Sequence, residues 1–92
     1  MYSLIDQVRR SSRSIGANLA ESWAKRRYPA HFASKLSDAD AELQETIHWL
    51  GRAKTYEYLS ENQHALWRED CHTIGGMLGK MISEPEGFLI KT

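Results

Sequence analysis

Hydrophobic residues recur at three- and four-residue steps along most of the chain, and this spacing predicts helices. The first expected helix covers about residues 4–24. On a helical wheel, at about 100° per residue, its apolar side chains share one arc. That arc comprises Leu4, Ile5, Val8, Ile15, Leu19 and Trp23. Gly16 and Ala20 border the arc on one side, where their small size would let a neighbouring helix approach closely.

A polar flank borders the other side of the same arc and contains Ser11, Ser14 and Asn18. Such residues weaken a helix relative to alanine, so their presence needs a reason. We expect the flank to face the second helix, where Asn18 would hydrogen-bond Glu42 or Thr46. A buried polar contact of this kind fixes the register of two helices at some cost in stability. The predicted interhelical polar contacts are therefore Ser11, Asn18, Glu42 and Thr46.

Tyr28-Pro29 separates the first helix from the second, because proline suits the first turn of a new helix and restricts the residue before it. The second expected helix covers about residues 30–57. Its apolar stripe is close to a heptad repeat. The stripe contains Phe32, Leu36, Ala39, Leu43, Ile47 and Leu50.

Ser60 and Gln63 have the spacing of a capping box, which predicts a third helix over about residues 60–82. Its apolar stripe contains Trp67, Cys71, Ile74, Leu78 and Met81. Gly75 and Gly76 each cost about 1 kcal/mol relative to alanine inside a helix. We therefore expect another backbone to approach them closely, or the helix to kink there. Pro85 ends the helix, and we expect the short apolar tail at 85–92 to dock on the bundle.

No segment has the alternation of a strand, so the sequence predicts an all-α fold. We expect one domain over residues 1–92, built as an antiparallel helical bundle of the four-helix-bundle type. Three amphipathic helices of this length make a small core, and their apolar stripes are wide. Further helices are therefore expected from other subunits.

The composition excludes several classes of protein. No apolar run is long enough to span a membrane. Asp6 and Arg9 interrupt any signal-peptide core near the N-terminus. Cys71 is the single cysteine and has no partner for an internal disulfide, so a cytoplasmic protein is expected.

The chain has twelve basic and twelve acidic residues, but they are unevenly distributed. Residues 1–35 carry a net charge of +5, and residues 36–92 carry −5. One interpretation is that basic and acidic helices face each other within the fold or between subunits. The other is that the basic residues form a surface for a polyanion such as RNA.

The sequence predicts neither a catalytic site nor a metal site. No nucleophile-elbow motif and no phosphate-binding glycine loop occurs. Glu45–His48 and Glu61–His64 have the Glu-x-x-His spacing of di-iron bundles, but His48 lies off the apolar arc of its helix. His64 and Cys71 share one side of a helix, where a buried structural cysteine explains the pattern better than zinc. We expect no cofactor and no small-molecule substrate.

Two motifs resemble a known family. Residues 7–21, QVRRSSRSIGANLAE, are similar to the Q-x-x-R-(S/A)-x-x-S-I-x-x-N-(I/L)-A-E signature of the 23S rRNA intervening-sequence proteins. Residues 35–50 resemble the K-L-x-x-A-x-x-E-x-x-E-T-x-x-W-L pattern of one branch of that family. The two motifs occur in order and at the right separation, so together they make the resemblance specific.

The resemblance implies a four-helix bundle that assembles as a ring-shaped homopentamer and has no enzymatic activity. Some members are encoded inside insertions of ribosomal RNA genes. A related branch, the accessory proteins of diversity-generating retroelements, binds nucleic acid and a reverse transcriptase through a basic surface. The family has a further helix before the first motif, whereas this sequence starts at that motif's helix. We therefore expect a single chain to expose an apolar groove.

We expect a non-enzymatic, oligomeric helical protein that binds RNA or an RNA-associated partner, such as a reverse transcriptase. The alternative is a scaffold whose charge asymmetry serves only subunit assembly. The expected nucleic-acid contacts are Arg9, Arg10, Arg13, Lys25, Arg26 and Arg27. Phosphate contacts of this kind lose affinity steeply as salt rises.

Overall fold

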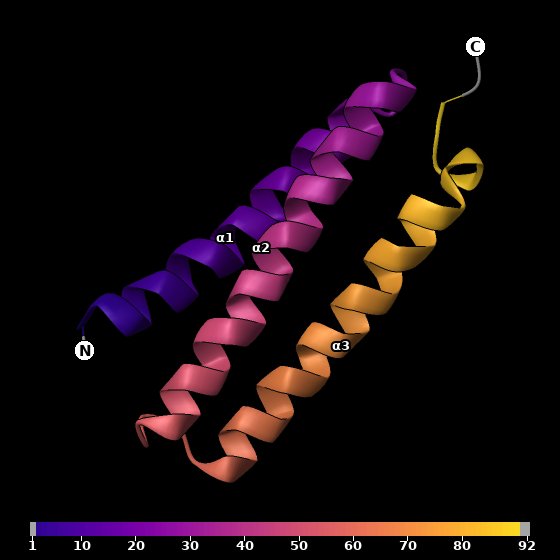
Figure 1. Ribbon diagram of the computed structural model, residues 1–92. Helices are drawn as coiled ribbons and strands as arrows, with labels where there is room; N and C mark the ends of the chain where they lie inside the picture. The colour runs from indigo at the N-terminus through magenta and orange to yellow at the C-terminus, as the bar shows by residue number, and fades with distance from the viewer. Residues whose placement is uncertain (1, 91–92) are drawn as a thin grey trace.

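A computed structural model describes residues 2–90, with side chains described for residues 4–90. It contains three α-helices: α1 (Tyr2–Ala24), α2 (Pro29–Thr55) and α3 (Glu61–Ser83). A single 3₁₀ turn, η1 (Pro85–Gly87), follows α3. Figure 1 shows that α2 runs antiparallel to both α1 and α3. The described residues contain no strand, which confirms the all-α class. Nowhere in residues 2–90 is a helix both long and apolar enough to cross a membrane.

Two of the helix starts follow directly from local sequence. Tyr28 is extended, with φ −119° and ψ 96°, and Pro29 occupies the first turn of α2. At α3, the backbone N–H of Gln63 donates to Ser60 Oγ at 3.1 Å, and the Ser60 N–H donates to Gln63 Oε1 at 3.0 Å. The predicted capping box is therefore present, and it satisfies donors that a helix start leaves open.

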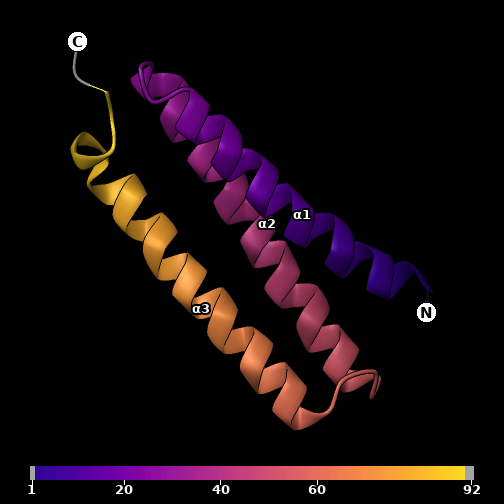
Figure 2. The same cartoon turned by 180° about the vertical axis from the view of Figure 1, so that it is seen from behind.

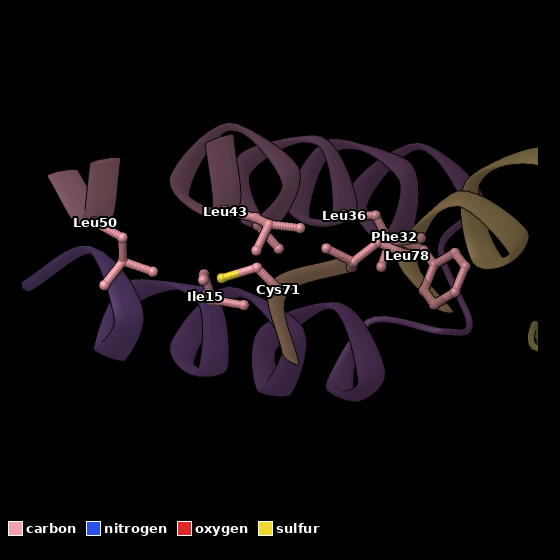
Figure 3. Close-up of a cluster of buried hydrophobic side chains, with 8 residues drawn as sticks. Ile15, Phe32, Leu36, Leu43, Leu50, Cys71 and Leu78 are labelled. Atoms are coloured by element: carbon pink, nitrogen blue, oxygen red, sulfur yellow. The ribbon is translucent and has the colours of Figure 1, made fainter. Parts of the chain in front are cut away.

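Helix α2 is the centre of the molecule. Its buried residues follow a heptad repeat, with alternating steps of four and three residues: Phe32, Leu36, Ala39, Leu43, Thr46, Leu50 and Ala53. Ile15 of α1 and the α3 residues Cys71 and Leu78 complete the core around them (Figure 3). The prediction placed Ile47 in this row, but Thr46 holds the buried position and Ile47 is only half-buried.

Half of the buried residues of α1 are polar. The buried residues are Leu4, Ser11, Ile15 and Ser22, and we call the contact of this side of α1 with α2 the seam. The polar flank therefore faces α2 at Ser11, as predicted. Because the seam lies towards the polar flank, part of the predicted apolar arc is left outside it. Ile5 and Trp23 are exposed, which corrects their expected place in the core.

The three helices form a thin layer, and α1 and α3 each pack mainly on α2 (Figures 1 and 2). The Cα atoms span 51 × 21 × 13 Å. A groove of about 340 Å³ runs between α1 and α3, with Thr46 of α2 among its lining residues. Its walls include Ser12, Ile15 and Leu19 from α1, and Ile74, Met77 and Met81 from α3. The single chain thus contains an apolar groove, as the family resemblance led us to expect.

Within the described chain, no other backbone approaches the glycines that were expected to permit a close approach. A Cβ added at Gly16 or at Gly76 would meet no other atom within 4 Å. At Gly75 the nearest neighbour would be the side-chain Cδ2 of Leu43, at 3.4 Å, and not another backbone. Ala20 is exposed as well, so no helix of this chain packs closely on the small-residue border of α1.

The described part of the tail folds back onto the bundle. Phe88 and Leu89 pack against the core, and the backbone N–H of Ile90 donates to the carbonyl of Arg26 at 3.2 Å. This bond ties the tail to the turn between α1 and α2. Residues 91–92 of the predicted tail lie outside the described residues.

Candidate nucleic-acid interface

The six predicted cationic contacts fall in two places. Three of them, Arg9, Arg10 and Arg13, lie along α1, and residues 25–27 form the turn that joins α1 to α2. All six are exposed except Arg26, which is half-buried. The sequence run Lys-Arg-Arg is therefore a turn between two helices, beyond the last residue of α1.

Arg10 is committed to contacts within the chain. Its guanidinium forms ion pairs with Glu42 at 3.4 Å and with Glu45, and its Nε donates to Gln7 at 3.0 Å. The α1 seam places Arg10 opposite the acidic side of α2, and this position explains the pairing. Arg10 stays a prediction as a nucleic-acid contact, with its guanidinium already paired to two carboxylates of its own chain.

Arg9 and Arg13 lie one turn apart on the exposed side of α1. Among the side chains of residues 4–90, neither forms an ion pair. Their charges therefore face solvent and are available to an anion.

The turn combines cations with aromatic rings. The guanidinium carbon of Arg26 lies 3.6 Å from the centre of the Trp23 ring, and Arg26 Nε donates to the Trp23 carbonyl at 2.9 Å. Lys25 Nζ lies 5.9 Å from the centre of the Tyr28 ring. Both distances fall within the range of cation–π attraction, which holds a cation in place without neutralising it.

A second ion pair also links α1 to α2. Lys35 Nζ lies 3.0 Å from Glu21 and 3.7 Å from Asp38. The hydrogen bond and the charge of Glu21 are the main causes of the raised pKa of Lys35, with a smaller effect from Asp38. Basic and acidic residues of this chain thus face each other at two points of the α1–α2 contact.

The interhelical polar contacts differ in part from the prediction. Thr46 Oγ1 donates to Ser11 Oγ at 2.7 Å across the α1–α2 seam. Asn18 instead donates from Nδ2 to the Ser14 carbonyl of its own helix at 3.0 Å, so its expected bond to Glu42 or Thr46 is absent. Glu42 contacts α1 through Arg10. Because the side-chain amide of Asn18 donates to the backbone of the preceding turn, it does not require a hydrogen-bond partner on α2.

Metal chemistry has no support in the described chain. Residues 2–90 contain no group of three or more histidine, cysteine or acidic side chains that could hold an ion. Cys71 lies in the core, where burial chiefly raises the pKa of its thiol and nearby Asp70 adds to the effect. A protonated, buried thiol is a poor nucleophile.

Two aromatic residues at the turn were not among the predicted nucleic-acid contacts. Trp23 was expected to pack in the core, yet 47% of its surface is exposed, and Tyr28 is 54% exposed. The available signal was their position, because Tyr28 follows the Lys-Arg-Arg run directly and Trp23 precedes it by two residues. Trp67 of α3, which was also expected in an apolar stripe, is 44% exposed but has no cation stacked on it.

Comparison with known proteins identifies a family that the chain matches. Residues 1–80 match the family model described as 23S rRNA-intervening sequence protein. No curated protein and no solved structure matches the chain. The matched residues include all of α1 and α2 and most of α3.

Proposed function

The chain belongs to the 23S rRNA-intervening sequence protein family, and on that premise we propose that it is a non-enzymatic, oligomeric protein that binds RNA through a basic surface. Its place of action is the cytoplasm. The observation that carries the proposal is that five of the six predicted cationic contacts have no acidic partner in residues 4–90. These five are Arg9, Arg13, Lys25, Arg26 and Arg27.

Electrostatics supports RNA as the ligand class. A set of unneutralised cations raises the local concentration of a polyanion and releases counterions when phosphates bind. The acidic half of the chain does not cancel this effect at the turn, because its ion pairs are those of Glu42 and Glu45 with Arg10 and of Asp38 with Lys35. An RNA-associated partner, such as a reverse transcriptase, would be held through the RNA.

The oligomeric part of the proposal rests on the exposed apolar surface. Met77 is 63% exposed on the wall of the groove between α1 and α3, and Ile5 and Trp67 are exposed as well. Large exposed apolar side chains of this kind mark interaction surfaces in small domains. Further subunits would bury them and enlarge a core that three helices leave thin.

The test is binding of a fluorescein-labelled RNA hairpin, followed by anisotropy at low salt. The double variant Arg26→Glu, Arg27→Glu should weaken binding at least tenfold and reduce the slope of log K against log salt by about one to two. The matched control is Arg52→Glu, Lys54→Glu, which reverses two exposed cations at the far end of α2. Failure of the wild-type protein to bind, or equal affinity of both double variants, would refute RNA binding.

A scaffold is the second candidate, and the ion pairs between α1 and α2 favour it. Arg10 with Glu42 shows that charges of the two halves serve packing in this chain, and Lys35 with Glu21, both in the basic half, also links α1 to α2. If unpaired cations serve subunit contacts in the same way, Arg26→Glu with Arg27→Glu should break the oligomer. Sedimentation velocity on the same variants separates the two functions, because the RNA proposal expects an unchanged assembly.

A further inference from the structure

The turn between α1 and α2 exposes an aromatic ring that already carries a cation on one face. Arg26 lies over the Trp23 ring at 3.6 Å, and nearly half of the tryptophan surface remains exposed. Tyr28 projects from the same turn and is even more exposed. Proteins bind single-stranded nucleic acids through exposed aromatic side chains beside cations. The bases stack on the aromatic rings, and the phosphates bind the cations.

The backbone of this turn is fixed before any ligand arrives. Within the turn, the N–H of Arg26 donates to the Trp23 carbonyl, and the N–H of Tyr28 donates to the Lys25 carbonyl. From outside the turn, Ile90 donates to the carbonyl of Arg26. A fixed turn holds its rings and charges in place, so less freedom is lost when a ligand binds.

Within the proposed function, and resting on it, we propose that Trp23 is a stacking platform for an unpaired base of RNA. Lys25 and Arg27 would bind the phosphates on either side. A base on the open part of the indole would extend the existing stack of guanidinium and ring. Bases in a duplex are already stacked in the helix, so the site should distinguish unpaired from paired RNA.

The experiment compares two labelled probes at one salt concentration: a 12-nucleotide single-stranded RNA and a 12-base-pair RNA duplex. Trp23→Ala should weaken binding of the single strand by about 5- to 150-fold, the range of one lost base stack, and leave the duplex within twofold. Trp23→Phe keeps an aromatic face and should restore most of the affinity. Trp67→Ala is the matched control, because Trp67 is equally exposed on α3.

Two results would overturn the stacking proposal while leaving RNA binding intact. One is a loss of affinity in Trp23→Ala that is equal for both probes, which would mean that Trp23 only positions Arg26. The other is an effect no larger than that of Trp67→Ala. In both cases the Arg26→Glu, Arg27→Glu variant would still bind RNA more weakly than wild type. Absence of binding by the wild-type protein would overturn both proposals together.

Discussion

Thr46 Oγ1 donates a 2.7 Å hydrogen bond to Ser11 Oγ in the buried seam between α1 and α2. Each hydroxyl carries one hydrogen, so Ser11 in turn donates to the Gln7 carbonyl at 2.9 Å. The pair thus forms a short chain of hydrogen bonds that fixes the register of two helices. No buried side-chain polar atom lacks a partner among the described residues.

Removing either hydroxyl should destabilise the fold. Ser11→Ala and Thr46→Val are each expected to lower the free energy of unfolding by about 1 kcal/mol, because the remaining hydroxyl loses one partner in the seam. The double variant should lose less than the sum, with a coupling of about 0.5–1.5 kcal/mol. Urea unfolding of the four proteins measures this. Ser12→Ala, which removes an exposed hydroxyl from the next residue, is the control, and strict additivity would contradict the coupling.

The heptad rhythm explains how far the sequence predicted this fold. Heptad spacing predicted most of the buried row of α2. The capping box and Pro29 predicted where two of the helices start. The sequence also predicted that the flank with Ser11 faces α2, but not how far α1 turns towards that flank, because the polar flank and the apolar arc are two competing faces. The choice between them depends on packing against Thr46, a contact 35 residues away that helical periodicity does not contain.

The candidate site was predicted unevenly for a related reason. Charge counting located the cations but could not identify which ones have acidic partners. Arg10 is neutralised only because Glu42 and Glu45 lie on the neighbouring helix. Trp23 was expected in the apolar arc of its helix, and helical periodicity does not reveal that its side chain is exposed.

Arg10 should contribute to stability more than to RNA binding. Its ion pairs are partly exposed, so Arg10→Ala should lower the free energy of unfolding by up to about 1 kcal/mol at low salt and by less at high salt. Arg13→Ala should leave stability unchanged and weaken RNA binding more than Arg10→Ala does. Thermal melts at two salt concentrations, combined with anisotropy, test this pair. A larger RNA defect in Arg10→Ala would contradict the assignment.

Gly76 is a position where stability can be gained. Because an added Cβ meets nothing within 4 Å, Gly76→Ala should raise the free energy of unfolding by about 0.5–1 kcal/mol through helix propensity alone. Gly75→Ala should gain less, since its methyl group would contact Leu43 Cδ2 at 3.4 Å. Urea titrations compare the two. Destabilisation by Gly76→Ala would show that a partner subunit packs against this side of α3.

Cys71 should make the fold sensitive to alkaline pH. Burial raises the pKa of its thiol from 9.0 in the folded state. At a pH between the pKa of the unfolded chain and the higher pKa of the folded one, the unfolded chain therefore binds fewer protons. Stability from the buried thiol is therefore complete below about pH 9 and falls as pH rises through the folded pKa. Cys71→Ala should flatten this fall, as measured by urea unfolding from pH 7 to pH 10. The pKa of Lys35 is raised from 10.5, so its titration lies above this range, and subtracting the two profiles isolates the cysteine.

The groove between α1 and α3 should drive self-association. Met77 lines it and is 63% exposed, so Met77→Gln should weaken the oligomer and leave the folded single chain intact. Leu66→Gln is a matched control, because Leu66 is exposed to the same extent on α3 but does not line this groove. Sedimentation velocity over a concentration series gives the association state of each protein. A wild-type protein that remains a stable, well-folded monomer at all concentrations would refute assembly through this groove.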